Sequence, residues 1–170
     1  MNSAHKVAYI GFLVSLSVIL TRIFSFYALP TIRIGFGNVP IIFSGILLGP
    51  ISGAITGGLS DVVGMLVFPS GGAYFPGFTI SKILLGAIPG IIMNHYKGSK
   101  VSGMVLSIIL SEIICSLILD TLWLSMFYNK GILAMLPSRI IARVIITAAE
   151  IPMVLVTYGA LNHALHLDKL

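Results

Sequence analysis

The chain has 170 residues, of which 57% are hydrophobic and only 9% are charged. Soluble globular domains carry about 25% charged residues, so this composition excludes a water-facing surface and indicates a protein that lies in lipid. The net charge of +5 comes from basic residues scattered along apolar stretches, without the basic tract of a nucleic-acid-binding domain. Because each span needs about 20 apolar residues, the length fits one membrane domain, residues 1–170, with about six spans.

The apolar runs predict an all-α membrane protein with six transmembrane helices. In chain order, these helices cover residues 4–26, 39–55, 60–67, 79–93, 101–127 and 138–163. No small-residue cleavage site follows the first helix, so we expect it to be retained. The short third helix cannot span the membrane alone, and broken segments of this kind usually line a cavity. We therefore expect a pocket beside it, with a surface hairpin as the alternative, and a partly re-entrant loop over residues 27–38.

The basic residues in the loops predict the orientation. Six spans place both termini on one side of the membrane, together with the loop over residues 94–100. That side holds Lys6, Lys97, Lys100 and Lys169, and the positive-inside rule makes it cytoplasmic. The sequence thus predicts a multi-pass protein of a bacterial cell membrane with both termini in the cytoplasm.

Positive charge also gathers in the opposite half, where orientation does not explain it. The basic residues there are Arg22, Arg33, Lys82, Lys130, Arg139 and Arg143. Charge in membrane segments is costly and usually functional. Arginine suits carboxylates because its guanidinium makes two parallel, charge-assisted hydrogen bonds. We expect an anionic ligand that enters from the outside and binds in an outward-facing pocket.

Some of these cations have a possible structural role instead. The hairpin of the last two helices brings Asp120 level with Arg143, and Glu112 level with Glu150. Asp120 and Arg143 are therefore either a structural ion pair or part of the ligand site. The better ligand candidates are the arginines with no acidic residue at their depth: Arg22, Arg33 and Arg139.

The segment FPSGGAYFPGFT, residues 68–79, combines aromatic side chains with glycine and proline. Tyr74, Phe75 and Phe78 offer flat faces to a planar ring. Pro76 stiffens the backbone, while the glycines let it bend or approach a ligand closely. This combination predicts a lid over an aromatic ligand, with an interfacial aromatic belt as the alternative.

Motifs of enzymes are missing from the sequence. It has no GxSxG, no HExxH and no cluster of histidine and cysteine with metal-ligand spacing, and its single cysteine, Cys115, excludes an internal disulfide. We expect no cofactor and no metal. A small membrane-embedded enzyme built on Asp61, Glu112 and Glu150 is the less favoured alternative, since Asp61 is also placed to cap the third helix. The P-loop motif is absent too, so an ATP-driven process would need a separate ATPase subunit.

Three segments resemble a known family: RIGFGNVPI (33–41), LLGPISGAITGGLSDVVG (47–64) and FPSGGAYFPGFTISKILLG (68–86). They are similar to the substrate-binding S components of energy-coupling factor (ECF) importers, and the third most resembles the folate-specific branch. LPSRI (136–140) adds a weaker match. The resemblance implies the six-helix S-component fold, a ligand site near the outer face gated by the first and third loops, and assembly with a transmembrane coupling subunit and two ABC ATPases.

The resemblance also implies a docking face of small residues at AxxxA spacing on the first helix. Ala4 and Ala8 have this spacing, and Gly11 and Ser15 continue it. Small residues allow close approach of helices in lipid. Packing within the chain is the alternative use of this face.

Folate fits the charge pattern and the aromatic segment together. It has a flat pterin, an aromatic linker and two carboxylates, whereas thiamine is cationic and riboflavin is uncharged. Pantothenate and biotin, with one carboxylate and no large aromatic system, are the alternative cargoes. The residues expected to bind the ligand are Arg22, Arg33, Tyr74, Phe75, Pro76, Phe78, Lys82, Arg139 and Arg143.

Overall fold

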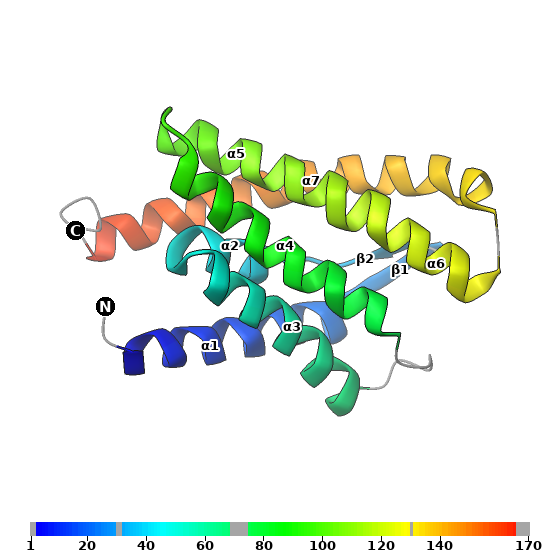
Figure 1. The fold of residues 1–170 in the computed structure, drawn as a ribbon, viewed down its shortest axis with the longest axis horizontal. Coiled ribbons are helices and arrows are strands. Elements are labelled where there is room, and N and C mark those ends of the chain that lie inside the picture. The colour runs from blue at the N-terminus through cyan, green and yellow to red at the C-terminus, as the bar shows by residue number, and fades with distance from the viewer. Residues whose placement is uncertain (1–2, 30–31, 69–74, 130, 166–170) are drawn as a thin grey trace.

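The computed structural model describes residues 3–29, 32–68, 75–129 and 131–165. The elements in chain order are α1 (Ser3–Arg22), β1 (Phe26–Leu29), β2 (Ile32–Ile34), α2 (Asn38–Leu48), α3 (Pro50–Val67), α4 (Pro76–His95), α5 (Lys100–Ser111), the π-helix η1 (Glu112–Leu119), α6 (Asp120–Tyr128) and α7 (Ile132–Leu165) (Figure 1). Because α5, η1 and α6 follow without a break, the described residues form six helical segments. This confirms the all-α membrane fold class.

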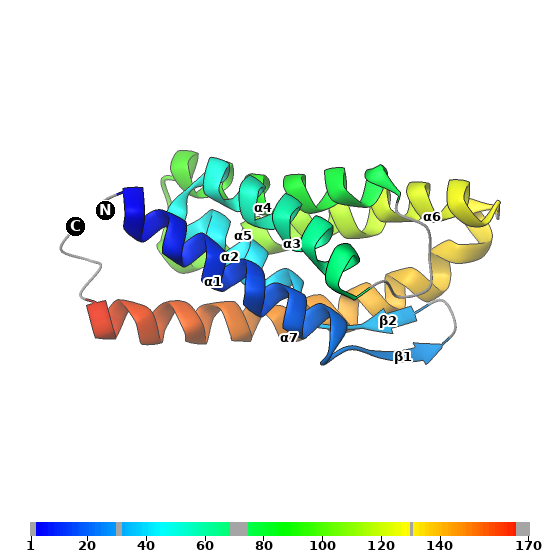
Figure 2. The same cartoon turned by 90° about the horizontal axis from the view of Figure 1, so that it is seen from below.

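The helices form an elongated bundle whose two ends differ. The start of α1 and the end of α7 lie at the same end, as an even number of spans requires (Figure 1). At the other end lie the β1–β2 hairpin, the end of α3, the end of α6 and the start of α7, and we call this the hairpin end (Figure 2). Five helical runs are long and apolar enough to cross a membrane, and α2 is a shorter apolar helix.

The short helix is the second one, not the third as the sequence analysis expected. α2 has 11 residues and α3 has 18. The dipeptide Gly49-Pro50 ends one helix and begins the next, because Gly49 has a φ of 91°, which L side chains rarely adopt, and Pro50 is the first residue of α3. Gly57 and Gly58 fall between the two helices expected over residues 39–55 and 60–67, but in the structure they continue α3 as regular helix.

Glycines hold α2, α3 and α4 in close contact. A Cβ added to Gly53 would lie 2.1 Å from the carbonyl oxygen of Gly86, and one added to Gly57 would lie 1.9 Å from that of Lys82. A Cβ on Gly45 would also meet Gly86, at 2.2 Å. Small residues at such crossings let backbones approach in lipid, so three helices pack here as one unit.

The segment after α1 contains a short antiparallel hairpin, which the sequence analysis did not foresee. β1 pairs with β2, with Tyr27 opposite Arg33 and an irregularity in the register between Tyr27 and Leu29. It lies beside the first part of α7 (Figure 2). The hairpin satisfies backbone groups within a segment that leaves the helical bundle.

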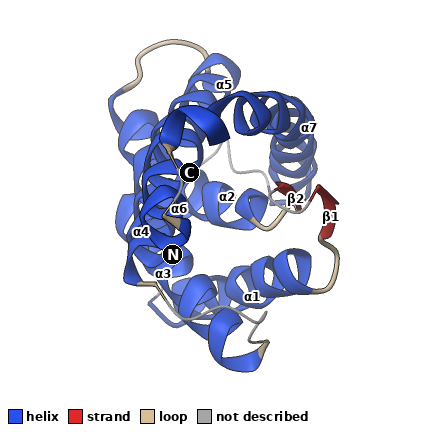
Figure 3. Ribbon diagram, turned by 90° about the vertical axis from the view of Figure 1, so that its right-hand side faces the viewer, coloured by secondary structure: helices blue, strands red, loops and turns tan. Residues whose placement is uncertain are grey.

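The protein core forms around α2. The first eight residues of α2, 38–45, are buried, and Figure 3 shows this helix in the middle of the bundle with the other helices around it. Ile42 of α2, Leu85 of α4, Ile108 of α5 and Val154 of α7 are almost completely buried. Many large apolar side chains on the outer helices are exposed, which is expected of surfaces that face lipid.

Replacing Gly53 by alanine is expected to destabilise the protein by about 1–3 kcal/mol, because the added methyl group forces α3 away from α4. The matched control is Gly159→Ala in α7, where a Cβ meets nothing within 4 Å. Alanine has the higher helix propensity, so the control is neutral or slightly stabilising. Thermal unfolding in detergent measures the stability of both variants. Equal unfolding midpoints for Gly53→Ala and Gly159→Ala would contradict the packing argument.

Candidate ligand-binding site

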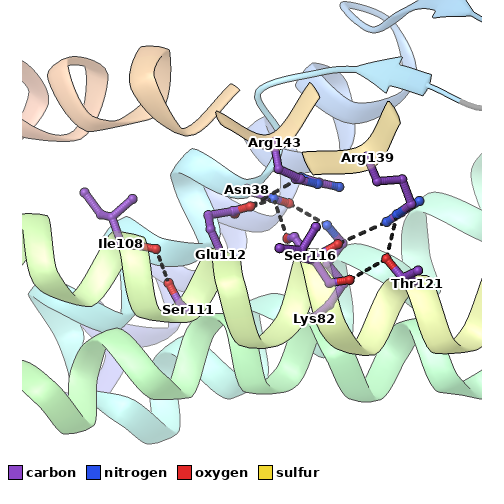
Figure 4. A network of polar contacts seen from close by, with 10 residues as sticks. Asn38, Lys82, Ile108, Ser111, Glu112, Ser116, Thr121, Arg139 and Arg143 are labelled. Carbon is purple, nitrogen blue, oxygen red and sulfur yellow. Dashed lines mark hydrogen bonds and ion pairs between the residues drawn. The ribbon is translucent and has the colours of Figure 1, made fainter. Parts of the chain in front are cut away.

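Asn38 joins three helices through its side-chain amide. It is the first residue of α2 and is buried. Its Nδ2 donates to Oε1 of Glu112 on η1 at 2.8 Å, and its Oδ1 accepts a hydrogen bond from Nζ of Lys82 on α4 (Figure 4). An amide can serve a carboxylate and an ammonium group at once because it has both a donor and an acceptor.

Arg143 forms an ion pair with Glu112, not with Asp120. Its Nη1 lies 3.3 Å from Oε2 of Glu112, and the Glu112 side chain is only 2% exposed. Because Asn38 donates to Oε1 and Arg143 to Oε2, both carboxylate oxygens of Glu112 have a partner (Figure 4). The Asp120–Arg143 pair considered from the sequence is therefore wrong as a direct contact. Asp120 is also buried, and its Oδ1 has no hydrogen-bond partner among the described residues.

Arg139 is held by neutral oxygens. Its Nε donates to Oγ1 of Thr121 at 2.8 Å, and its Nη2 donates to the backbone carbonyl of Ser116 at 3.0 Å (Figure 4). Its side chain is 8% exposed, and within the described ranges it forms no ion pair. A buried guanidinium without a bonded carboxylate is well placed to accept an anion.

The π-helix η1 brings the polar groups of the fifth span onto one buried face. In a π-helix a backbone N–H donates to the carbonyl five residues earlier, where an α-helix uses the fourth. The Asp120 N–H, for example, donates to the Cys115 carbonyl. Glu112, Ser116 and Asp120 are all buried as a result, and the Ser116 carbonyl accepts from Arg139. π-helical turns are rare and occur frequently at functional sites.

An aromatic cluster lies next to this polar network. The ring of Phe75 lies 5.8 Å from those of Phe78 and Trp123 and 6.2 Å from that of Phe127, measured between centroids. Trp123 donates from Nε1 to Oγ of Ser81 at 3.1 Å. These contacts join the start of α4 to α6, with Phe75, Phe78 and Trp123 half-buried and Phe127 exposed.

The cluster depends on a glycine. A Cβ at Gly77 would lie 2.5 Å from the ring of Phe75 and 2.6 Å from that of Trp123. Pro76 is the first residue of α4, where its fixed φ suits the helix and its missing N–H costs no hydrogen bond. Tyr74 lies outside the described residues.

Two predicted arginines lie apart from this cluster. Arg22, the last residue of α1, contacts α3, since a Cβ on Gly64 would lie 3.2 Å from its Nε. Arg33 is on β2 opposite Tyr27, and its side chain is not among the described ones. The structure thus brings together Lys82, Arg139 and Arg143 with Phe75 and Phe78, while Arg22 and Arg33 belong to the segments around the hairpin.

Asp61 does not cap α3, because this helix begins eleven residues earlier, at Pro50. Its Oδ2 accepts a hydrogen bond of 2.6 Å from Oγ1 of Thr79 on α4. Asp61 therefore links two helices near the hairpin end.

The predicted docking residues form an exposed face on α1. Ala4, Ala8, Gly11 and Ser15 are all exposed, and a Cβ on Gly11 would meet nothing within 4 Å. Ser15 bonds back to the Gly11 carbonyl at 2.9 Å, within its own helix. Packing within the chain, the alternative use of this face, does not occur among the described residues.

Sequence reasoning missed several polar residues of the site: Asn38, Ser81, Ser116, Thr121 and Trp123. Asn38 carried a usable signal, since it is the polar residue directly before the apolar run of α2. The serines and threonine carried none, because such residues are common in membrane helices, where they often bond to their own backbone.

Comparison with known proteins assigns the family. The model of the substrate-specific component of ECF transporters matches residues 5–166. The chain belongs to this family. It is therefore a component of a membrane transporter and not an enzyme, which confirms both predictions.

The chain is similar to individual members of the family. It is 34% identical to the folate transporter FolT of Clostridium novyi (strain NT) over 160 residues, which are 94% of this chain and 90% of that protein. The crystal structure of FolT bound with folic acid has a TM-score of 0.72 at 34% identity, covering 86% of this chain and 87% of that one. The S component for biotin from an ECF-type ABC transporter has a TM-score of 0.72 at 21% identity, covering 91% and 92%, and shows the fold alone.

Replacing Asn38 by alanine is expected to destabilise the protein by about 1–3 kcal/mol, because Lys82 and Glu112 each lose a buried partner. Asn94→Ala is the matched control, since Asn94 is exposed at the end of α4. Thermal unfolding in detergent compares the stability of the two variants with that of the wild type. If both asparagine variants unfolded at the wild-type temperature, Asn38 would not hold the network.

Proposed function

We propose that this chain is the folate-binding component of an ECF importer. It captures folate at the outer face of the membrane, and partner subunits hydrolyse ATP to deliver the vitamin inside. The similarity to FolT at 34% identity over 94% of the chain supports folate as the cargo. An S component for pantothenate or biotin is the alternative, and the similarity to the biotin S component at 21% identity does not favour it.

The observation that carries the proposal is a junction of cationic and aromatic groups on α4. Ser81 accepts a hydrogen bond from Trp123 of the aromatic cluster, and the next residue, Lys82, donates to Asn38 of the polar network. A ligand at this junction meets flat rings on one side and buried cations on the other. Folate has this chemistry, since its pterin and benzoate rings are planar and its glutamate carries two carboxylates.

Arg139 is the strongest candidate for a carboxylate contact. Its guanidinium has five N–H donors, of which two are used by Thr121 and the Ser116 carbonyl. Arg143 already forms an ion pair with Glu112, so it is expected to contribute less than Arg139 to ligand binding. Phe75 and Phe78 are proposed to contact the rings together with Pro76, and Arg22, Arg33 and Tyr74 to act from the gating segments around the first and third loops.

The hairpin end of the bundle is proposed to face the outside, with both termini in the cytoplasm. Lys6, Lys97 and Lys100 then lie on the cytoplasmic side, in agreement with the positive-inside rule. The partners are a transmembrane coupling subunit and two ABC ATPases. The exposed face Ala4–Ala8–Gly11–Ser15 on α1 is proposed to dock the coupling subunit, since close approach of helices in lipid needs small side chains.

Folate binding to the purified chain tests the function. Trp123, the single tryptophan, lies in the proposed site, so bound folate is expected to quench its fluorescence. Arg139→Ala is expected to weaken binding about tenfold or more, because a hydrogen bond to a charged group contributes ~1.5–3 kcal/mol. Arg139→Lys keeps the charge but loses the planar fork, and an intermediate affinity is expected.

The matched control is Lys97→Ala, which removes one positive charge from an exposed position at the other end of the bundle. It is expected to bind folate like the wild type. Pantothenate, biotin, thiamine and riboflavin are measured in parallel. Saturable binding of one of these in place of folate would refute the cargo and retain the transport class.

The docking face is tested by Ala8→Leu, which places a large side chain where a partner helix is expected to approach. This variant is expected to bind folate normally and to lose co-purification with the coupling subunit and folate uptake in reconstituted vesicles. Ala148→Leu, at an exposed position of α7, is the control and is expected to assemble. Normal assembly of Ala8→Leu would contradict the proposal that this face of α1 docks the coupling subunit.

A further inference from the structure

An apolar groove of about 460 Å³ lies between α1 and α7, with α2 as its floor. Both outer helices pack on α2 but have little contact with each other, and Figure 3 shows α2 between them. Exposed side chains such as Phe12 of α1 and Ala160 of α7 form its rims, so the groove opens sideways toward the lipid. None of the residues of the proposed ligand site lines it.

The groove has the depth of one membrane leaflet. Tyr9, Leu47 and Leu161 line it toward the end of the bundle that holds the start of α1, and Leu20 and Val39 line it at the level where α2 begins (Figure 2). From Tyr9 to Leu20 the helix rises about 16 Å. This is close to half of the roughly 30 Å hydrocarbon core of a membrane.

The lining indicates an apolar occupant. A water molecule in a cavity needs several polar partners. The side chains around the groove offer only the hydroxyls of Tyr9 and Thr157, and Thr157 already donates to the Met153 carbonyl at 2.7 Å. If the groove were empty, its walls would lose the dispersion contacts that packed carbon atoms make. Hydrocarbon supplies these contacts.

The size of the groove favours a single hydrocarbon chain over a partner helix. A helical segment of the same length, at least ~10 Å across, occupies about 1,250 Å³. This is more than twice the volume of the groove. A partner helix can therefore cover the groove but cannot enter it, whereas a lipid tail is narrow enough to lie along it.

A cation stands at the mouth of the groove. Lys6 lies three residues before Tyr9 and seven before Leu13, which places it on the side of α1 that faces the groove. It is exposed and has no ion-pair partner among the described residues. Tyrosine side chains often mark the headgroup level of a membrane, and basic residues beside membrane helices attract anionic headgroups.

We propose that the groove binds one acyl chain of an anionic phospholipid whose headgroup pairs with Lys6. The chain fills the space between α1 and α7 that the protein leaves open. The exposed face Ala4–Ala8–Gly11–Ser15 lies on another side of α1, so this lipid and a docked partner can be present together. The leaflet that supplies the lipid rests on the orientation proposed above, whereas the binding of the lipid does not.

Native mass spectrometry of the purified full chain tests the proposal. Phosphatidylglycerol and phosphatidylcholine with identical acyl chains are titrated into the detergent-solubilised protein. We expect the chain to retain one phosphatidylglycerol, with an affinity about fivefold above that for phosphatidylcholine, because one basic residue near an anionic headgroup contributes ~1 kcal/mol.

Two kinds of variant separate the headgroup from the acyl chain. Lys6→Gln is expected to abolish the preference for phosphatidylglycerol and to bind phosphatidylcholine like the wild type. Ala160→Phe fills the groove and is expected to weaken binding of both lipids at least tenfold, with a smaller effect for Ala160→Leu. The matched controls are Lys97→Gln and Ala148→Phe, at exposed positions that do not line the groove, and both are expected to bind lipid like the wild type.

Three results would overturn the lipid site. The first is equal lipid binding by Ala160→Phe and Ala148→Phe, and the second is a wild type that retains no lipid or does not distinguish the two headgroups. The third is loss of co-purification with the coupling subunit in Ala160→Phe while its lipid is retained, which would assign the groove to a partner protein.

Folate binding to the same samples keeps this inference separate from the proposed function. All variants are expected to bind folate like the wild type, because no residue of the ligand site lines the groove, and this also shows that they are folded. A wild type that retains the lipid but does not bind folate would refute the cargo and leave the lipid site standing. Thermal unfolding then shows whether each variant is folded.

Discussion

The hydrogen bonds of Asn38 are the contacts on which the rest of the site depends. Inside a membrane, each buried polar group needs a partner from the protein, because lipid supplies none. Asn38 provides one partner to Lys82 and another to Glu112, and Glu112 in turn holds Arg143. Side chains from α2, α4, η1 and α7 thus form one network, which gives Lys82, Glu112 and Arg143 polar partners from within the protein.

The position of Asn38 follows from backbone packing. Gly45, Gly53 and Gly86 leave no room for a Cβ between α2, α3 and α4, so α2 lies in the centre of the bundle with its first residue at the level of Lys82. The π-helix completes the arrangement from the other side, since its wider turns place Glu112 and Ser116 on one buried face. Helix packing and helix type, rather than the polar residues alone, bring the site together.

Sequence reasoning reached the fold class, the family and part of the site for physical reasons. Apolar runs identify spans because lipid selects for them, and Arg139 was notable as a cation without an acid at its depth. The boundary between α2 and α3 was misplaced because Gly57 and Gly58 resemble a break, although they serve helix packing. Arg143 was matched with Asp120 because counting residues assumes α-helical periodicity, and the π-helix η1 changes that register. Asn38 was overlooked because its partners are distant in sequence.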